Sequence, residues 1–144
     1  MGTRCLTVFV DDDGISEIAV LYRQFDGYPD GHGLRLKEWA GDRYLVNGLI
    51  GNDNEVWNGM GCLAADCVAH FKKKTGGFYL YPANTRDVGE DYIYTLSKKE
   101  ITPTHVEGYT RERWGLWLKV QDSAKSTVYE GWIKEFDSDA ILRI

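Results

Sequence analysis

Apolar and polar residues alternate at the start of the chain, and this alternation predicts a β-hairpin. Thr3–Val10 and Ile15–Arg23 each place their apolar residues on every second position, and both are rich in β-branched and aromatic residues. The segment between them, Asp11–Gly14, ends in an Asp-Gly pair that suits a tight connection between antiparallel strands.

The apolar spacing changes to a helical period in two later segments. Leu34–Ala40 is predicted as a short amphipathic helix that stops at Gly41. A longer helix is predicted from Met60 to Lys74, because apolar residues recur there at three- and four-residue intervals.

The remaining apolar segments are short and predict strands. We expect strands at Phe78–Pro82, Tyr92–Leu96, Thr102–Val106, Trp114–Val120 and Thr127–Phe136, and an irregular segment at Asp42–Trp57. The sum predicts an α+β fold, a mostly antiparallel sheet of six to seven strands with two helices packed on one face. No linker or repeat interrupts residues 1–144, so a single compact domain is expected.

Composition and charge narrow the function classes. The formal net charge of −5 argues against a nonspecific grip on a nucleic-acid polymer, which needs a basic face. No run approaches the roughly 18 apolar residues of a membrane span. The 3 cysteines include no metal-type pair and favour reduced thiols, so a cytoplasmic protein is expected.

One stretch, Tyr22–Gly33, is unusually rich in both turn residues and binding groups. It reads Tyr-Arg-Gln-Phe-Asp-Gly-Tyr-Pro-Asp-Gly-His-Gly. Its glycines and proline exclude a regular strand or helix, and a simple chain reversal would not need the arginine, tyrosine and histidine. Loops on a rigid scaffold are where binding groups concentrate, so this loop is a candidate site.

The sequence carries no positive signal for an enzyme, a metal or a cofactor. The histidines form no ligand pair along the chain, and Asp66 and His70, four residues apart, are better explained as an ion pair than as metal ligands. Nucleotide-binding and nucleophile motifs are absent. No catalytic residue is therefore assigned.

What remains is a set of residues suited to recognising a small anionic, ring-bearing ligand. Arginines can bind phosphate, tyrosines can stack on a base, and amides and carboxylates can read hydroxyl groups. The candidate ligand-binding residues are Arg4, Arg23, Gln24, Asp26, Tyr28, His32, Tyr79, Tyr81, Asn84, Arg86 and Asp87. The alternative is that Arg23–Asp26 and Arg86–Asp87 pair with each other and only order two loops.

Several motifs together resemble a family of small, mostly uncharacterised proteins of bacteriophages and prophages. These motifs are the Met-Gly-Thr-Arg start, the Tyr22–Gly33 stretch, Asn-Gly-Met-Gly-Cys-Leu-Ala-Ala, Gly-Gly-Phe-Tyr-Leu-Tyr-Pro and Thr-Arg-Asp-Val-Gly-Glu. The resemblance covers roughly residues 2–95. It implies, by analogy with viral proteins that sequester immune signals, a sponge acting in the host bacterial cytoplasm.

Three functions are therefore carried forward. The first is a non-enzymatic protein that sequesters a nucleotide-derived immune signal, such as a cyclic ADP-ribose-type molecule or a cyclic dinucleotide, and so antagonises anti-phage defence. The second is an enzyme that cleaves such a signal, with His32 as acid or base beside Asp26. The third is a protein inhibitor of a host factor. A homodimer is also expected, because Trp114, Trp117 and Trp132 are many large rings for short strands to bury.

Overall fold

A computed structural model of the chain describes residues 2–48, 56–106 and 109–137, and for 102–106 and 109–112 it describes the backbone alone. The strands are β1 (Cys5–Val10), β2 (Glu17–Arg23), β3 (Tyr44–Val46), β4 (Val56–Asn58), β5 (Phe78–Pro82), β6 (Tyr92–Val106), β7 (Tyr109–Asp122) and β8 (Thr127–Trp132). The helices are α1 (Leu34–Ala40) and α2 (Gly59–Phe71), with a π-helical turn η1 (Pro29–Gly33) and a 3₁₀ turn η2 (Ile133–Glu135).

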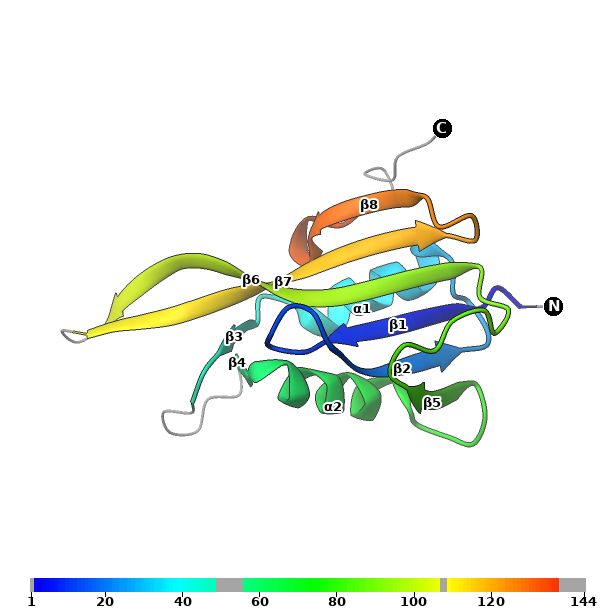
Figure 1. Ribbon diagram of the computed structural model, residues 1–144, viewed down its shortest axis with the longest axis horizontal. Coiled ribbons are helices and arrows are strands. Elements are labelled where there is room, and N and C mark those ends of the chain that lie inside the picture. The colour runs from blue at the N-terminus through cyan, green and yellow to red at the C-terminus, as the bar shows by residue number, and fades with distance from the viewer. Residues whose placement is uncertain (1, 49–55, 107–108, 138–144) are drawn as a thin grey trace.

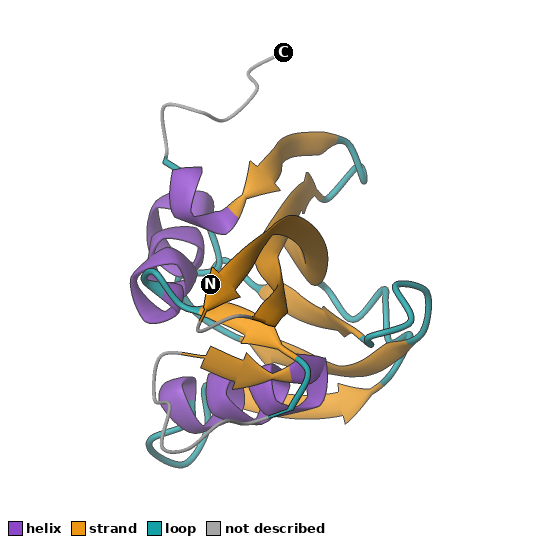
Figure 2. Ribbon diagram, turned by 90° about the vertical axis from the view of Figure 1, so that its left-hand side faces the viewer, coloured by secondary structure: helices purple, strands orange, loops and turns teal. Residues whose placement is uncertain are grey.

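The eight described strands form one curled sheet in the order β4-β3-β7-β6-β1-β2-β5, with β8 paired to β7 (Figure 1). Seen from the side, α1 and α2 lie against one face of this sheet (Figure 2). The α+β class and the two helices on one face are confirmed. Five of the seven described strand pairings are antiparallel, as expected, and the sheet is mixed because β1 pairs with β6 and β3 pairs with β4 in parallel.

The strand count was predicted too low for a physical reason. β3 and β4 are only three residues long. The glycines and asparagines between them are typical of turns, so the whole segment was predicted to be irregular. Residues 49–55 of that segment lie outside the described residues. The predicted strands Tyr92–Leu96 and Thr102–Val106 are parts of the single strand β6, which continues through the polar residues Lys98 and Lys99 between them. Their ammonium groups lie 4.4 and 3.6 Å from the ring centres of Trp114 and Trp117.

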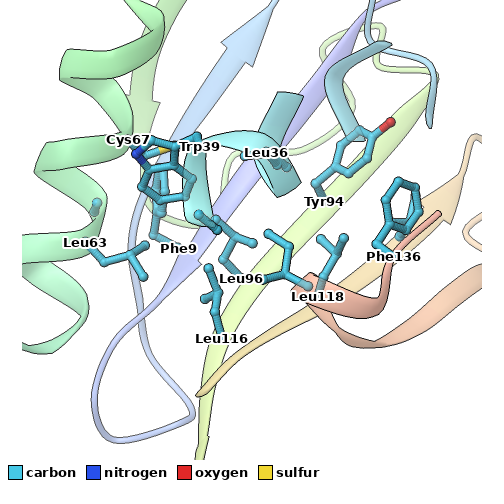
Figure 3. Close-up of a cluster of buried hydrophobic side chains, with 14 of the residues drawn as sticks. Phe9, Leu36, Trp39, Leu63, Cys67, Tyr94, Leu96, Leu116, Leu118 and Phe136 are labelled. Carbon is cyan, nitrogen blue, oxygen red and sulfur yellow. The ribbon is translucent and has the colours of Figure 1, made fainter. Parts of the chain in front are cut away.

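The core lies between the helices and the sheet (Figure 3). Phe9, Leu63 and Leu118 are fully buried there. In α2 the apolar stripe faces this core through Leu63 and Cys67, whereas Cys62 is exposed. A smaller cluster on the other face of the sheet contains the fully buried Leu6, Val8 and Val20.

Candidate functional site

The predicted loop folds inward, and its histidine becomes part of the core. The turn η1 carries His32 to a fully buried position beneath the sheet. There the Thr7 Oγ1 atom lies 2.7 Å from His32 Nε2, and the Arg23 Nη1 atom lies 3.1 Å from His32 Nδ1. The ring also packs against Tyr94 and Phe71, with centroid distances of 4.9 and 5.2 Å.

The partners of His32 define its protonation state. A guanidinium group only donates hydrogen bonds, so Nδ1 must accept from Arg23 and the proton sits on Nε2, which donates to Thr7. Burial lowers the pKa of His32 to about 3, and the charge of Arg23 acts in the same direction. A histidine that is neutral, buried and bonded at both nitrogens is not placed to serve as the acid or base of the cleaving-enzyme hypothesis.

Arg23 is occupied as a brace for the same loop. Its Nε–H donates to the Phe25 carbonyl at 2.6 Å, and its guanidinium lies 5.0 Å from the centre of the Phe78 ring. Asp26 is 4.0 Å away, at the limit of an ion pair, and it is largely exposed. Arg23 and Asp26 also border a hollow of about 290 Å³ beside Lys73 and Lys74.

Further contacts tie the loop to the sheet. The Tyr94 hydroxyl donates to the Gly27 carbonyl at 2.7 Å, and burial raises the pKa of Tyr94 well above its ordinary value. A Cβ at Gly33 would lie 2.8 Å from the Phe136 ring, so a glycine is required for this close approach. Tyr28 remains exposed, and Gln24 joins the loop through its backbone N–H, which donates to Gly77.

Arg86 lies in a different place from Arg23, so the two do not form one phosphate clamp. Its guanidinium binds Glu17 through contacts of 2.7 and 3.2 Å. Glu17 and Arg23 occupy opposite ends of β2. They also lie on opposite faces, because Arg23 is opposite Cys5 of the helix-covered face and Glu17 is opposite Val10 of the other face.

The other predicted residues are spread around the second arginine and the sheet edge. The Asn84 backbone N–H donates to Glu17, and Asp87 lies 3.9 Å from the Lys125 Nζ atom. Tyr79 and Tyr81 both pack against Tyr22 on the open face of β5. Arg4 is half-buried beside Gly89, and its Nε atom has no hydrogen-bond partner in residues 2–48, 56–106 and 109–137. The structure therefore distributes these residues over several places and does not gather them into one site.

A larger cavity lies among residues that were not predicted to form a site. It has a volume of about 430 Å³ and is lined by residues 41–44 after α1, by β7 around Arg113, and by residues 132–135 at the end of β8 and in η2. Its charged groups are Asp42, Arg43, Arg113, Lys134 and Glu135. Three are basic and two acidic, and two aromatic residues, Tyr44 and Trp132, also line it.

Arg113 is the residue of this cavity with unused hydrogen-bonding capacity. Its guanidinium lies 4.2 Å from the centre of the Tyr44 ring, and its Nε atom is buried with no hydrogen-bond partner in the described part of the chain. A buried donor without an acceptor costs about 1–3 kcal/mol, and such exceptions call for an explanation. Across the cavity, a Cβ at Gly115 would lie 2.6 Å from the Trp132 ring, so the glycine lets this indole lie across β7.

A second arginine of the cavity, Arg43, is held in place by an ion pair with Asp66. The Arg43 Nη1 atom donates to Asp66 at 2.7 Å, and the indole N–H groups of Trp57 and Trp39 donate to the same carboxylate oxygen at 2.9 and 3.1 Å. Partial burial opposes ionisation of Asp66, but the bonds from Trp57, Arg43 and Trp39 outweigh it and lower its pKa. The predicted Asp66–His70 ion pair is therefore wrong: Asp66 serves Arg43 and the indoles, while His70 is exposed.

The comparisons with known proteins add no family or neighbour. No family model, curated protein or solved structure matches the chain. In the part of the chain that the structure describes, no cluster of three or more His, Cys, Asp or Glu side chains is arranged to hold a metal ion. Within the same residues, none of the helices has the length and apolar character needed to cross a bilayer.

Proposed function

We propose that this protein is a non-enzymatic binding protein that captures a small anionic, ring-bearing ligand of the nucleotide-derived class in the cavity around Arg113. The observation that carries the proposal is Arg113, which lines this cavity and whose buried Nε–H has no hydrogen-bond partner among the described residues. The planar guanidinium of Arg113 can bind phosphate through two parallel bonds.

The rest of the cavity suits the same ligand class. Its volume of about 430 Å³ falls within the roughly 300–1,000 Å³ of small-molecule sites. The rings of Tyr44 and Trp132 offer surfaces on which a base can stack. Lys134 adds a second cation that, unlike Arg43, forms no described ion pair.

Capture is favoured over turnover by the state of the histidines. His32 is buried away from solvent with a pKa of about 3, and no histidine borders this cavity among the described residues. The resemblance to bacteriophage proteins supports a role in the host bacterial cytoplasm, where withdrawing a nucleotide signal would antagonise defence. A protein that sequesters a signal needs affinity for it but no catalytic group, so the cavity has to supply only binding contacts.

The test is a thermal-shift screen followed by recovery of the ligand. The probes are cyclic ADP-ribose, ADP-ribose, 3′,3′-cyclic di-AMP and cyclic di-GMP, with inorganic phosphate as the control for a bare anion. A binding probe should raise the melting temperature and return chemically unchanged after the protein is denatured. A new product would support the cleaving enzyme instead. A flat response to every probe would refute capture of these signals and leave the inhibitor of a host factor as the better hypothesis.

Two matched variants locate the site. Arg113→Ala should weaken binding about 10- to 100-fold, because a charge-assisted hydrogen bond contributes about 1.5–3 kcal/mol. Arg86→Ala removes the same side chain from the opposite part of the sheet and should bind as the parent does. Normal binding by Arg113→Ala would exclude this cavity, and a loss in an Arg23 variant that remains folded would move the site to the hollow beside Lys73 and Lys74.

A further inference from the structure

The strand β5 ends the sheet, and one of its edges has no partner among the described strands. It pairs with β2 on one side and stands last in the strand order (Figure 1). Its sequence, Phe-Tyr-Leu-Tyr-Pro, carries no charge. Leu80 at its centre is 60% exposed and Tyr79 is 44% exposed. Natural edge strands usually carry charges or bulges that prevent pairing with another chain, so this edge is open to it.

The hydrogen bonds show which backbone groups face outward. The Gln24 N–H donates to the Gly77 carbonyl at 2.8 Å, directly before the register pair Arg23–Phe78. Hydrogen-bonded and non-hydrogen-bonded pairs alternate along antiparallel strands. The pair Leu21–Leu80 is therefore non-hydrogen-bonded, and the Leu80 N–H and C=O point away from β2 toward the free edge.

The two ends of that edge are already occupied. The Phe78 carbonyl accepts a bond from the Lys72 ammonium at 3.0 Å. Pro82 has no N–H, and its carbonyl accepts the Thr85 hydroxyl at 2.7 Å. Leu80 is thus the residue of β5 whose outward donor and acceptor both have no partner among the described residues and can bind a strand. Only a partner centred on Leu80 fits this edge.

We propose that a second copy of the chain occupies this edge, with the two β5 strands antiparallel about a two-fold axis at Leu80. Each Leu80 N–H then donates to the Leu80 carbonyl of the other copy, and each Tyr79 lies opposite the other copy's Tyr81. On one face the two Leu80 side chains cover each other. On the other face the Tyr22 clusters, with ring distances of 6.1 and 5.8 Å to Tyr79 and Tyr81, become continuous.

Charge favours the antiparallel orientation. The exposed Lys73 and Lys74 precede the Phe78 end of β5, whereas the exposed Asp11 and Asp13 lie in the hairpin beyond the opposite end of β2. Antiparallel pairing brings the basic end of one copy toward the acidic end of the other. Parallel pairing would set like charges together, which opposes association. This surface is separate from the cavity around Arg113, so it does not depend on the ligand proposal.

The experiment is sedimentation equilibrium over a concentration series, with three substitutions at one position. The parent chain should sediment as a dimer of the 16.4-kDa chain at high micromolar concentration. Leu80→Lys adds a charge at the contact, and Leu80→Pro removes the outward N–H without removing a bond to β2. Each should raise the dimer dissociation constant at least about tenfold with the circular dichroism unchanged, while Leu80→Val should stay within about threefold of the parent.

The register has its own test. Leu80→Cys in a Cys62→Ser background, which removes the exposed native thiol, should cross-link to a covalent dimer with a short thiol-specific reagent. A parent chain that stays monomeric at several hundred micromolar would overturn the proposal. A dimer that persists in both Leu80→Lys and Leu80→Pro would also overturn it. If such a dimer dissociated in Trp117→Ala, the interface would lie at the tryptophan-rich strands instead.

Discussion

Arg23 and Arg113 sit in similar chemical surroundings, yet the structure uses them differently. Each guanidinium lies over an aromatic ring, 5.0 Å from the centre of Phe78 and 4.2 Å from that of Tyr44. Arg23 donates to a carbonyl and to a histidine nitrogen, whereas the Arg113 Nε atom is buried and has no partner among the residues that the structure describes. An arginine whose donors are used internally holds the fold, and one that lines a cavity is the better candidate for binding a ligand.

The largest expected effect is on stability and concerns His32, the hydrogen-bond partner of Arg23. His32→Ala should lower the free energy of unfolding by about 3–5 kcal/mol, because it empties a fully buried ring site and leaves Arg23 and Thr7 without their partner. Urea denaturation followed by circular dichroism measures it. A loss below about 1 kcal/mol would mean that the loop is not anchored by this ring.

A matched pair of substitutions compares the two arginines directly. Arg23→Met should cost about 1–3 kcal/mol of stability, since His32 Nδ1 is left without a donor. Arg113→Met should change stability by less than about 1 kcal/mol, because it removes a buried donor that has no partner within the described structure. The comparison fails if the two variants lose the same stability in parallel urea titrations.

The burial of His32 also predicts how the free energy of unfolding depends on pH. Above about pH 6.5 the folded and unfolded chains both hold His32 neutral, so this residue adds no pH dependence. Below that pH the unfolded chain takes up a proton that the folded chain, with a His32 pKa of about 3, does not accept. Stability should therefore fall by about 1.4 kcal/mol per pH unit from this group, or roughly 2 kcal/mol between pH 6.5 and 5. Urea titrations at several pH values should show a smaller slope in His32→Gln.

A similarly small effect is expected at Arg86, the arginine of the opposite face. The partly exposed Arg86–Glu17 pair is a short ion pair, so Arg86→Ala should cost about 1 kcal/mol or less. The hydrogen bonds from Arg86 and Asn84 outweigh partial burial and lower the pKa of Glu17, so this contribution is present above the ordinary glutamate pKa and is lost in acid. A cost near that of His32→Ala would show that the loop after β5 organises the fold as strongly as η1 does.

Local patterns predicted the parts of the fold that depend on neighbouring residues. The β1–β2 hairpin, the helix Leu34–Ala40 and the strand Phe78–Pro82 follow from alternation and helical spacing. The parallel pairing of β1 with β6 does not, because nothing in either strand encodes a partner so far along the chain. The predicted end of α2 was three residues too late, since Lys72–Lys74 continue the helical composition after the helix stops at Phe71.

The candidate site was less accessible to sequence reasoning. The loop Tyr22–Gly33 was recognised as special, but its polar groups are used to bury His32. The cavity around Arg113 joins three segments, near residues 42, 113 and 133, and no spacing links them. Two of the three tryptophans that suggested a dimer pack on each other within the chain, with the Trp117 and Trp132 rings 5.3 Å apart. A self-association through those rings remains a prediction.

The position of β1 has a consequence for how the chain reaches this structure. β1 lies in the interior of the sheet, yet its partner on one side, β6, begins about 90 residues further along the sequence. Closing so long a loop is entropically costly and slows folding. A nascent chain that has not yet emerged past Tyr92 therefore holds the β1–β2 hairpin with one long side open, a natural point for chaperone capture.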